Sequence, residues 1–151
     1  MKTAKIAGAA ALAAAVIVPL AGTAAAVPAG HPYVAEIYYN SPGKDTRSNA
    51  SRNAEWVKIV NPTAHAVSLT GWTVKDRQNH TYRFGTFTLK AHGTVVLHTG
   101  TGRNTTTSRY WGSGNYIWNN DTDAATLRNS RNAVVDSLAY KNSHVAYVKH
   151  R

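Results

Sequence analysis

Short apolar runs separated by turn residues constrain the fold of this chain more than any other feature. After Ala26, no apolar pattern with the 3.6-residue period of a helix persists for ten residues. Segments rich in Pro, Gly, Asn and Asp separate the runs, as turns require. The runs cover residues 34–39, 56–60, 72–75, 81–84, 87–89, 94–99, 125–128 and 134–140. This pattern predicts an all-β fold, a sandwich of about eight strands.

Side-chain alternation predicts which residues of these strands form the core. Successive side chains of a strand point to opposite faces, so Val57 and Ile59 share one face and Lys58 lies on the other. A lysine is almost never buried without a partner, so we assign Val57 and Ile59 to the core. We expect Val95 and Leu97 to meet them from a second strand, and the further core candidates are Leu127 and Leu138.

The chain has no cysteine, which excludes a disulfide framework, a thiolate zinc site and a cysteine nucleophile. Four Trp and eight Tyr must therefore supply much of the packing area. The bulky packing groups that we expect are Trp56, Trp72, Tyr82, Phe84 and Trp118. Gly71 precedes one of these rings, and we expect it to mark a position where a side chain would obstruct a ring.

Residues 1–26 have the pattern of a secretory signal peptide. Lys2 and Lys5 form a cationic start, residues 6–20 form an apolar run, and Ala24 and Ala26 supply a small-x-small cleavage site. A retained membrane anchor is the alternative, but the run is shorter than the roughly 20 residues that a spanning helix needs. We therefore expect a secreted, extracellular protein that is retained near the cell surface, with no membrane span after cleavage.

Cleavage leaves 125 of the 151 residues, with 15 Lys and Arg against seven Asp and Glu, a net charge of +8. Residues 27–140 are expected to form one domain, because a chain of this size can bury a core without metal or crosslinks. Residues 141–151 lack clear periodicity and are expected to be a frayed basic tail.

Several segments occur in an order and at a spacing that are specific when taken together: residues 55–61, 69–74, 80–84 with 87–93, 117–121 before 125–128, and 134–136. In this order and spacing the chain resembles the lamin tail domain family, and in particular its exported bacterial members. The resemblance implies an immunoglobulin-like β-sandwich that serves binding rather than catalysis. In lamins this domain is a docking surface for proteins, chromatin and DNA. The chain lacks a coiled-coil rod, so filament formation does not carry over.

The acidic residues do not predict a catalytic centre. Glu36 and Glu55 open neighbouring strands, and we interpret them as capping groups or as ion-pair partners of Lys58 or Arg52. Asp76 and His80 bracket a predicted hairpin turn, but no nucleophile motif accompanies them. We therefore expect no catalytic residue, and a small secreted hydrolase of phosphoesters or glycans remains an alternative.

No metal or cofactor is expected either. Asp121 and Asp123 resemble a calcium loop in composition only, because the Gly and the distal Glu of that motif are missing, and we interpret them as a polar turn. None of the seven His residues shows the spacing of a zinc site. These side chains are interpreted as scattered surface groups.

Two long loops, residues 44–54 and 100–114, combine positive charge with rings. Arginine pairs with phosphate or carboxylate and rings stack on bases or sugars, which suits an anionic polymer. Wall polyanions, acidic polysaccharides and DNA are the candidate partners. The predicted contacts are the cations Lys44, Arg47, Arg52, Arg103 and Arg109 with the rings Tyr110 and Trp111.

Other interpretations of the charge and of the rings stay open. The charge could serve solubility alone if it is spread over all faces. A domain that binds a surface protein through aromatic residues is the remaining alternative. We expect a monomer.

Overall fold

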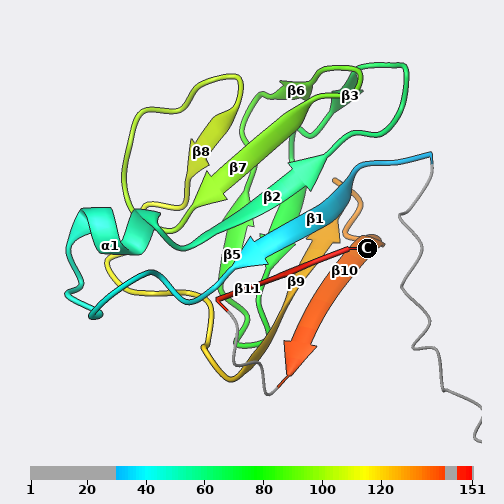
Figure 1. The fold of residues 1–151 in the computed structure, drawn as a ribbon. Helices are drawn as coiled ribbons and strands as arrows, with labels where there is room; N and C mark the ends of the chain where they lie inside the picture. Colours follow the sequence, from blue (N-terminus) through cyan, green and yellow to red (C-terminus); the bar gives the residue numbers. More distant parts are fainter. Residues whose placement is uncertain (1–29, 142–145, 151) are drawn as a thin grey trace, which may run out of the picture.

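The computed structural model describes residues 30–141 and 146–150, so the predicted signal peptide at residues 1–26 lies outside the described residues. The described ranges contain eleven strands and one short helix (Figure 1). They are β1 (Tyr33–Tyr38), α1 (Asn49–Asn53), β2 (Trp56–Val60), β3 (Val67–Ser68), β4 (Thr73–Lys75), β5 (Thr81–Arg83), β6 (Thr88–Leu89), β7 (Thr94–His98), β8 (Ser108–Tyr110), β9 (Thr122–Arg128), β10 (Val134–Lys141) and β11 (Tyr147–Lys149).

The strands form two main sheets that pack face to face, which confirms the predicted immunoglobulin-like sandwich. One sheet has five strands in the order β11-β1-β2-β7-β8, and the other has four in the order β10-β9-β4-β5. β3 and β6 form a two-stranded ribbon. β7 and β8 are parallel, whereas the other pairs are antiparallel.

The predicted core residues lie between the sheets. Val57 pairs with Leu97 and Ile59 with Val95 across β2 and β7, and all four are buried. Leu127 and Leu138 join the same cluster from the four-stranded sheet. The sequence prediction of the core is confirmed, because strand alternation fixes which side chains face inward.

Each of the eight predicted runs corresponds to a strand, but the structure adds β3, β8 and β11 and the helix α1. β8 consists of Ser108, Arg109 and Tyr110, so it carries no apolar alternation that sequence reasoning could detect. α1 has only five residues and starts at the Ser48 cap, whose side chain accepts a hydrogen bond from the backbone N–H of Ser51.

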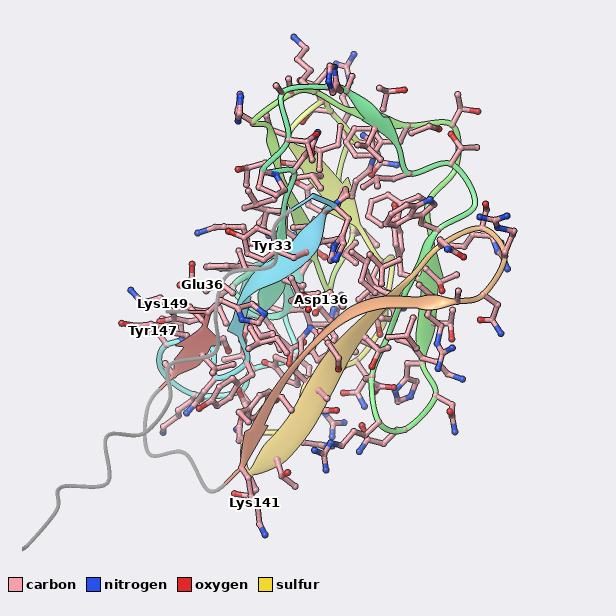
Figure 2. The ribbon with its side chains drawn as sticks, turned by 90° about the vertical axis from the view of Figure 1, so that its right-hand side faces the viewer. Tyr33, Glu36, Asp136, Lys141, Tyr147 and Lys149 are labelled. Atoms are coloured by element: carbon pink, nitrogen blue, oxygen red, sulfur yellow. The ribbon has the colours of Figure 1, made fainter. Side chains whose placement is uncertain are left out.

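The expectation of a frayed tail is wrong for residues 147–149, which form β11 along the edge of β1. Tyr147 stacks on Tyr38 with ring centroids 6.0 Å apart, and the N–H of His150 donates to the carbonyl of Ala35 at 3.0 Å. Figure 2 shows Tyr147 and Lys149 on this strand, beside Glu36 of β1. Backbone pairing and ring stacking order this segment, although its sequence is too short to show a period.

Gly71 is required for a different reason from the one predicted. Its φ of +76° lies in the left-handed region, and a Cβ there would come within 3.4 Å of the Cβ of Ser130 rather than meet a ring. Phe84 and Trp118 are core residues, as expected, and Trp72 and Tyr82 pack against that core.

A row of rings crosses the outer face of the five-stranded sheet. Strand pairing places its members in one register line: Tyr147, Tyr38, Trp56, His98 and Tyr110. Tyr38 stacks on Trp56 at 5.4 Å, and His98 stacks on Tyr110 at 5.1 Å between ring centroids. The stacked rings link neighbouring strands across the sheet and stabilise them beyond the backbone ladder.

Candidate functional site

The two basic loops predicted from the sequence meet at one end of the sandwich. The side-chain amide of Asn49 donates to the carbonyl of Thr101 at 2.9 Å and its oxygen accepts from the N–H of Thr101 at 2.8 Å. Asn53 donates to the same carbonyl at 2.9 Å. These bonds join α1 to the segment that follows β7, so both loops belong to one surface, which we call the loop end.

Three of the five predicted cations are exposed at this loop end. Lys44, Arg47 and Arg103 make no side-chain hydrogen bond or ion pair with other residues of the described ranges. The backbone N–H of Arg47 donates to the hydroxyl of Tyr116 at 3.4 Å, which ties its loop to the following segment. These three side chains can reach a ligand without breaking a described contact.

The other two predicted cations hold the loops together. Arg52 donates to the carbonyls of Arg47 and Gly114. Arg109 donates to the carbonyl of Thr105, and its guanidinium carbon lies 4.0 Å from the centroid of the Phe87 ring. A guanidinium has five N–H donors, but these two are partly occupied by the chain itself.

The two predicted rings do not lie side by side. Tyr110 points to the outer face, where it stacks on His98 and covers Gly102. Trp111 packs against the core, with its ring centroid 6.0 Å from that of Trp118 in an edge-to-face arrangement. Both rings already serve packing within the domain.

The structure reveals a second cationic surface that sequence reasoning missed. We call it the cationic face. It is the outer side of the four-stranded sheet, and its charged residues are Lys75, Arg83, Arg128 and Lys141. These residues point outward because Val74, Tyr82 and Leu127, their neighbours along the strands, face the core. Figure 2 shows Lys141 at the end of β10.

Strand register sets the spacing on the cationic face. Thr73 pairs with Arg83 on one side and with Arg128 on the other, so the two arginines are two strand spacings, roughly 10 Å, apart. Lys75 lies two residues further along the central strand and pairs with Thr126. Each arginine donates one bond to a nearby carbonyl, at 2.9 Å, and keeps its other donors.

Among the residues that the structure describes, none places a carboxylate on the cationic face. The seven acidic residues of the chain all lie elsewhere: Glu36, Asp45, Glu55, Asp76, Asp121, Asp123 and Asp136. Glu36 lies on the five-stranded sheet, where it forms an ion pair of 2.6 Å with Lys58 of the neighbouring strand, as the sequence predicted. Asp136 faces inward and accepts from the N–H of Val34 at 2.7 Å. Within residues 30–141 and 146–150, the cationic face therefore carries one sign of charge only.

Two of the remaining acids are buried turn anchors. Asp76 accepts from the N–H of His80 at 2.7 Å and contacts its ring nitrogen at 2.6 Å. Asp123 was interpreted as part of a polar turn, but it is the second residue of β9, fully buried, and accepts four hydrogen bonds. Within the described ranges, no three His, Asp or Glu side chains gather as a metal site would require.

A small pocket of about 190 Å³ lies at the loop end, and we call it the end pocket. It is lined by three aromatic residues, two acids and two amides: Tyr39, Asp45, Glu55, Tyr116, Trp118, Asn119 and Asn120. None of these residues belongs to the predicted polyanion site. The pocket joins the end of β1, the start of β2 and the segment before β9.

Glu55 is buried beneath the end pocket and caps two backbone groups. Its carboxylate accepts from the N–H groups of Ile117 and Trp118, each at 3.0 Å. Burial raises the pKa of Glu55 from 4.5 to about 7, because the loss of hydration outweighs these two bonds, which lower it. The capping role predicted for Glu55 is confirmed. The alternative, an ion pair between Glu55 and Arg52, is not formed within the described residues.

The fold and the sequence together decide the family. The sequence matches the family model described as Lamin Tail Domain over residues 25–142. The chain belongs to the lamin tail domain family. The immunoglobulin-like fold of this family is compatible with a non-catalytic binding module. No curated protein matches the chain. Within residues 30–141 and 146–150, no helix has the length and apolarity needed to cross a bilayer.

Proposed function

We propose that this lamin tail domain is an exported, non-catalytic module of the bacterial type that attaches to an anionic polymer at or near the cell surface. One observation carries the proposal: Lys75, Arg83 and Arg128 project from one sheet face, on which the described part of the chain places no carboxylate. A surface with one sign of charge attracts an extended polyanion and releases its counterions on binding.

Hydroxyl groups between the cations favour a polymer with many acceptor oxygens. Thr126 and Ser137 lie side by side on the cationic face, with their hydroxyl oxygens 3.2 Å apart. Arginine donors in a fixed planar fork match phosphate, sulfate or carboxylate groups. The exposed cations of the loop end, Lys44, Arg47 and Arg103, would add contacts to a polymer long enough to reach them.

Retention on charged matrices at increasing salt tests the proposal. The purified protein is applied to dextran sulfate, to immobilised DNA and to uncharged dextran. We expect retention on both polyanions that falls steeply between about 50 and 200 mM salt, and none on dextran. Binding that does not depend on salt would contradict the proposal. Export is tested by the intact mass of secreted protein, and a mass that retains Met1 would contradict it.

The aromatic row favours a second candidate function, the binding of a surface protein. Tyr147 is 40% exposed at one end of the row. Lys58 lies over the ring of Trp56, and Lys149 lies over the ring of Tyr147. Capture of one extracellular protein that persists at high salt, and that is lost when Trp56 or Tyr147 is replaced, would favour this function over polymer binding.

A further inference from the structure

The aromatic row on the outer face of the five-stranded sheet is a stripe only one residue wide. Its five rings keep part of their surface exposed, and Tyr147 is 40% exposed. On one side the next register line is charged, with Glu36 between Lys149 and Lys58. A globular partner covers a broad surface, roughly 800 Å² per side. A narrow apolar stripe beside charged groups therefore fits a linear ligand better than a folded surface.

The rings of the row are offset, so each offers part of a face. The planes of Tyr38 and Tyr147 differ by 9° with centroids 6.0 Å apart, and those of Tyr38 and Trp56 differ by 20° at 5.4 Å. Atoms in contact are only roughly 3.5–4.0 Å apart, so these nearly parallel rings overlap only in part. His98 and Tyr110 stack in the same way at 5.1 Å. A linear ligand that crosses the strands therefore meets one ring on each strand.

The spacing of the rings matches the period of a polyproline II helix. Neighbouring strands lie about 4.8 Å apart, so the rings on alternate strands, Tyr147, Trp56 and Tyr110, are about 9.6 Å apart. A polyproline II helix has three residues per turn and rises about 3.1 Å per residue, so every third residue recurs after about 9.3 Å. Side chains on one face of a β-strand recur after about 6.7 Å, which matches neither one strand spacing nor two. Prolines at every third position would therefore reach three rings of the row.

The polar atoms of the row are available to carbonyl groups of a ligand. The hydroxyls of Tyr38, Tyr110 and Tyr147 form no hydrogen bond with another described residue, and neither does the indole N–H of Trp56. The polar atoms of Tyr38, Trp56 and Tyr110 also keep contact with solvent, so a ligand can reach them. A polyproline II segment has no internal hydrogen bonds, so its carbonyl groups can accept from these donors.

The charge beside the row indicates what flanks such a segment. The Lys58 ammonium already forms an ion pair of 2.6 Å with Glu36. Lys149 is exposed and forms no ion pair within residues 30–141 and 146–150. Its Nζ lies 5.8 Å from the centroid of the Tyr147 ring, at the β11 end of the row (Figure 2). An acidic residue next to the prolines would therefore complement the charge of Lys149.

We propose that the aromatic row binds a proline-rich segment of a surface protein in the polyproline II conformation, with an acidic residue at the end that faces Lys149. The prolines pack on Tyr147, Trp56 and Tyr110, and the free hydroxyl and indole donors bind the carbonyl groups between them. A rigid proline segment loses little conformational entropy on binding, which favours this class of ligand. The inference rests on the second candidate function, protein binding by the row, and is independent of the cationic face.

Nuclear magnetic resonance titration of the whole chain tests this inference. The probes are three peptides of equal length: ten prolines with an Asp at each end, ten prolines with a Lys at each end, and ten alternating Gly and Ser residues with an Asp at each end. We expect the Asp-ended proline peptide to shift the Trp56 indole N–H signal saturably at high micromolar to millimolar concentrations. The Gly/Ser peptide should bind at least about tenfold more weakly, because it lacks rigid rings. Lys149→Gln should reduce the preference for Asp-ended over Lys-ended prolines by about threefold or more.

Substitutions in the row test which rings make the contacts. Trp56→Thr and Tyr110→Thr should each lower the affinity for the Asp-ended proline peptide about tenfold, since each removes one ring contact. Trp72→Phe lies outside the row and should leave the affinity unchanged. The amide spectrum of each variant shows whether it is folded, and either row variant is sufficient for the comparison.

Three results would overturn the inference: no saturable shift with the proline peptides, equal affinity for the proline and Gly/Ser peptides, or unchanged affinity in a folded row variant. Capture of a folded surface protein that depends on Trp56, without binding of the proline peptides, would overturn this inference and leave the second candidate function standing. Retention on dextran sulfate should be the same for the row variants as for the natural protein, so failure here is distinguishable from failure of the polyanion proposal.

Discussion

Asp123 joins three parts of the chain through one carboxylate. Oδ1 accepts from the backbone N–H of Arg77 at 3.0 Å, and Oδ2 accepts from the backbone N–H of Asn119 at 3.1 Å. Arg77 lies in the turn between β4 and β5, and Asn119 precedes β9. This single buried group therefore sets the positions of two turns, one of which carries part of the end pocket.

Asp123→Ala should destabilise the domain by about 3 kcal/mol or more, because it leaves several buried N–H groups without an acceptor. Asp121→Ala is the matched control, since Asp121 is exposed two residues away, and it should change stability by no more than about 0.5 kcal/mol. Urea denaturation of both variants measures the difference. Equal stabilities would show that Asp123 does not anchor these turns.

Glu55 makes stability depend on pH. Its folded pKa of about 7 lies above the ordinary 4.5, so the native state binds more protons than the unfolded state between these values. The free energy of unfolding contributed by this group is therefore fully present below about pH 4.5. It falls by up to about 3 kcal/mol as the pH rises through 7.

Glu55→Gln removes this titration. The variant loses one acceptor for a backbone N–H, a cost that does not change with pH. We expect the stability of the variant relative to the natural protein to improve by up to about 3 kcal/mol between pH 4.5 and pH 8, measured by urea denaturation at both values. Parallel pH profiles of the two proteins would contradict the assignment.

Some of these residue roles could be read from the sequence, and others depend on local register. Val57 and Ile59 were placed correctly because alternation within one strand suffices. The prediction that Asp123 belongs to a turn is wrong, because the apolar run begins only at Ala125 whereas β9 begins at Thr122. Alternation back from Leu127 and Ala125 puts Asp123 on the inner face, and this signal was present in the sequence.

At the scale of elements, the loops around the end pocket depend on side-chain contacts that no local pattern predicts. Asn49 and Asn53 lie one turn apart on α1, and both bond Thr101, which is about fifty residues away along the chain. The loops themselves were predicted by their length and composition. Their meeting was not, because sequence gives no information about which loops share an end of a sandwich.

β11 illustrates how little sequence signal an edge strand needs. Its three residues pair with β1, and the Tyr147 ring adds a stack on Tyr38 that an isolated tail would lack. Such short edge strands open locally more easily than core strands. The stability of β11 should therefore depend strongly on this one ring.

Tyr147→Ala should release β11 while leaving the rest of the sandwich folded. We expect the amide protons of Val148 and His150 to exchange at least about tenfold faster than in the natural protein, because the stacked ring contributes about 1 kcal/mol or more. Hydrogen exchange measured by nuclear magnetic resonance detects the change. Lys149→Gln keeps the ring and is the control, and faster exchange in it to the same degree would contradict the role of the stack.

At the scale of the whole molecule, strand register separates the charges. Arg128 lies far from Lys75 and Arg83 in the sequence, yet pairing of β4 with β5 and β9 brings all three onto one face. The net charge was evident from composition, but its distribution required the order and register of the strands. The loop cations predicted from local clustering share their end of the molecule with Asp45 and Asp121, so the charge there is mixed.

A comparison of two matched triple variants decides where a polyanion binds. The first variant removes three charges from the cationic face and carries Lys75→Gln, Arg83→Gln and Arg128→Gln. The second variant removes three charges from the loop end and carries Lys44→Gln, Arg47→Gln and Arg103→Gln. Affinity for duplex DNA is measured as a function of salt for both variants and for the natural protein. We expect the first variant to lower the logarithmic salt slope by about 2–3 and the second to lower it by less than about 1. The opposite order, or equal slopes in all three proteins, would contradict the assignment of binding to the cationic face.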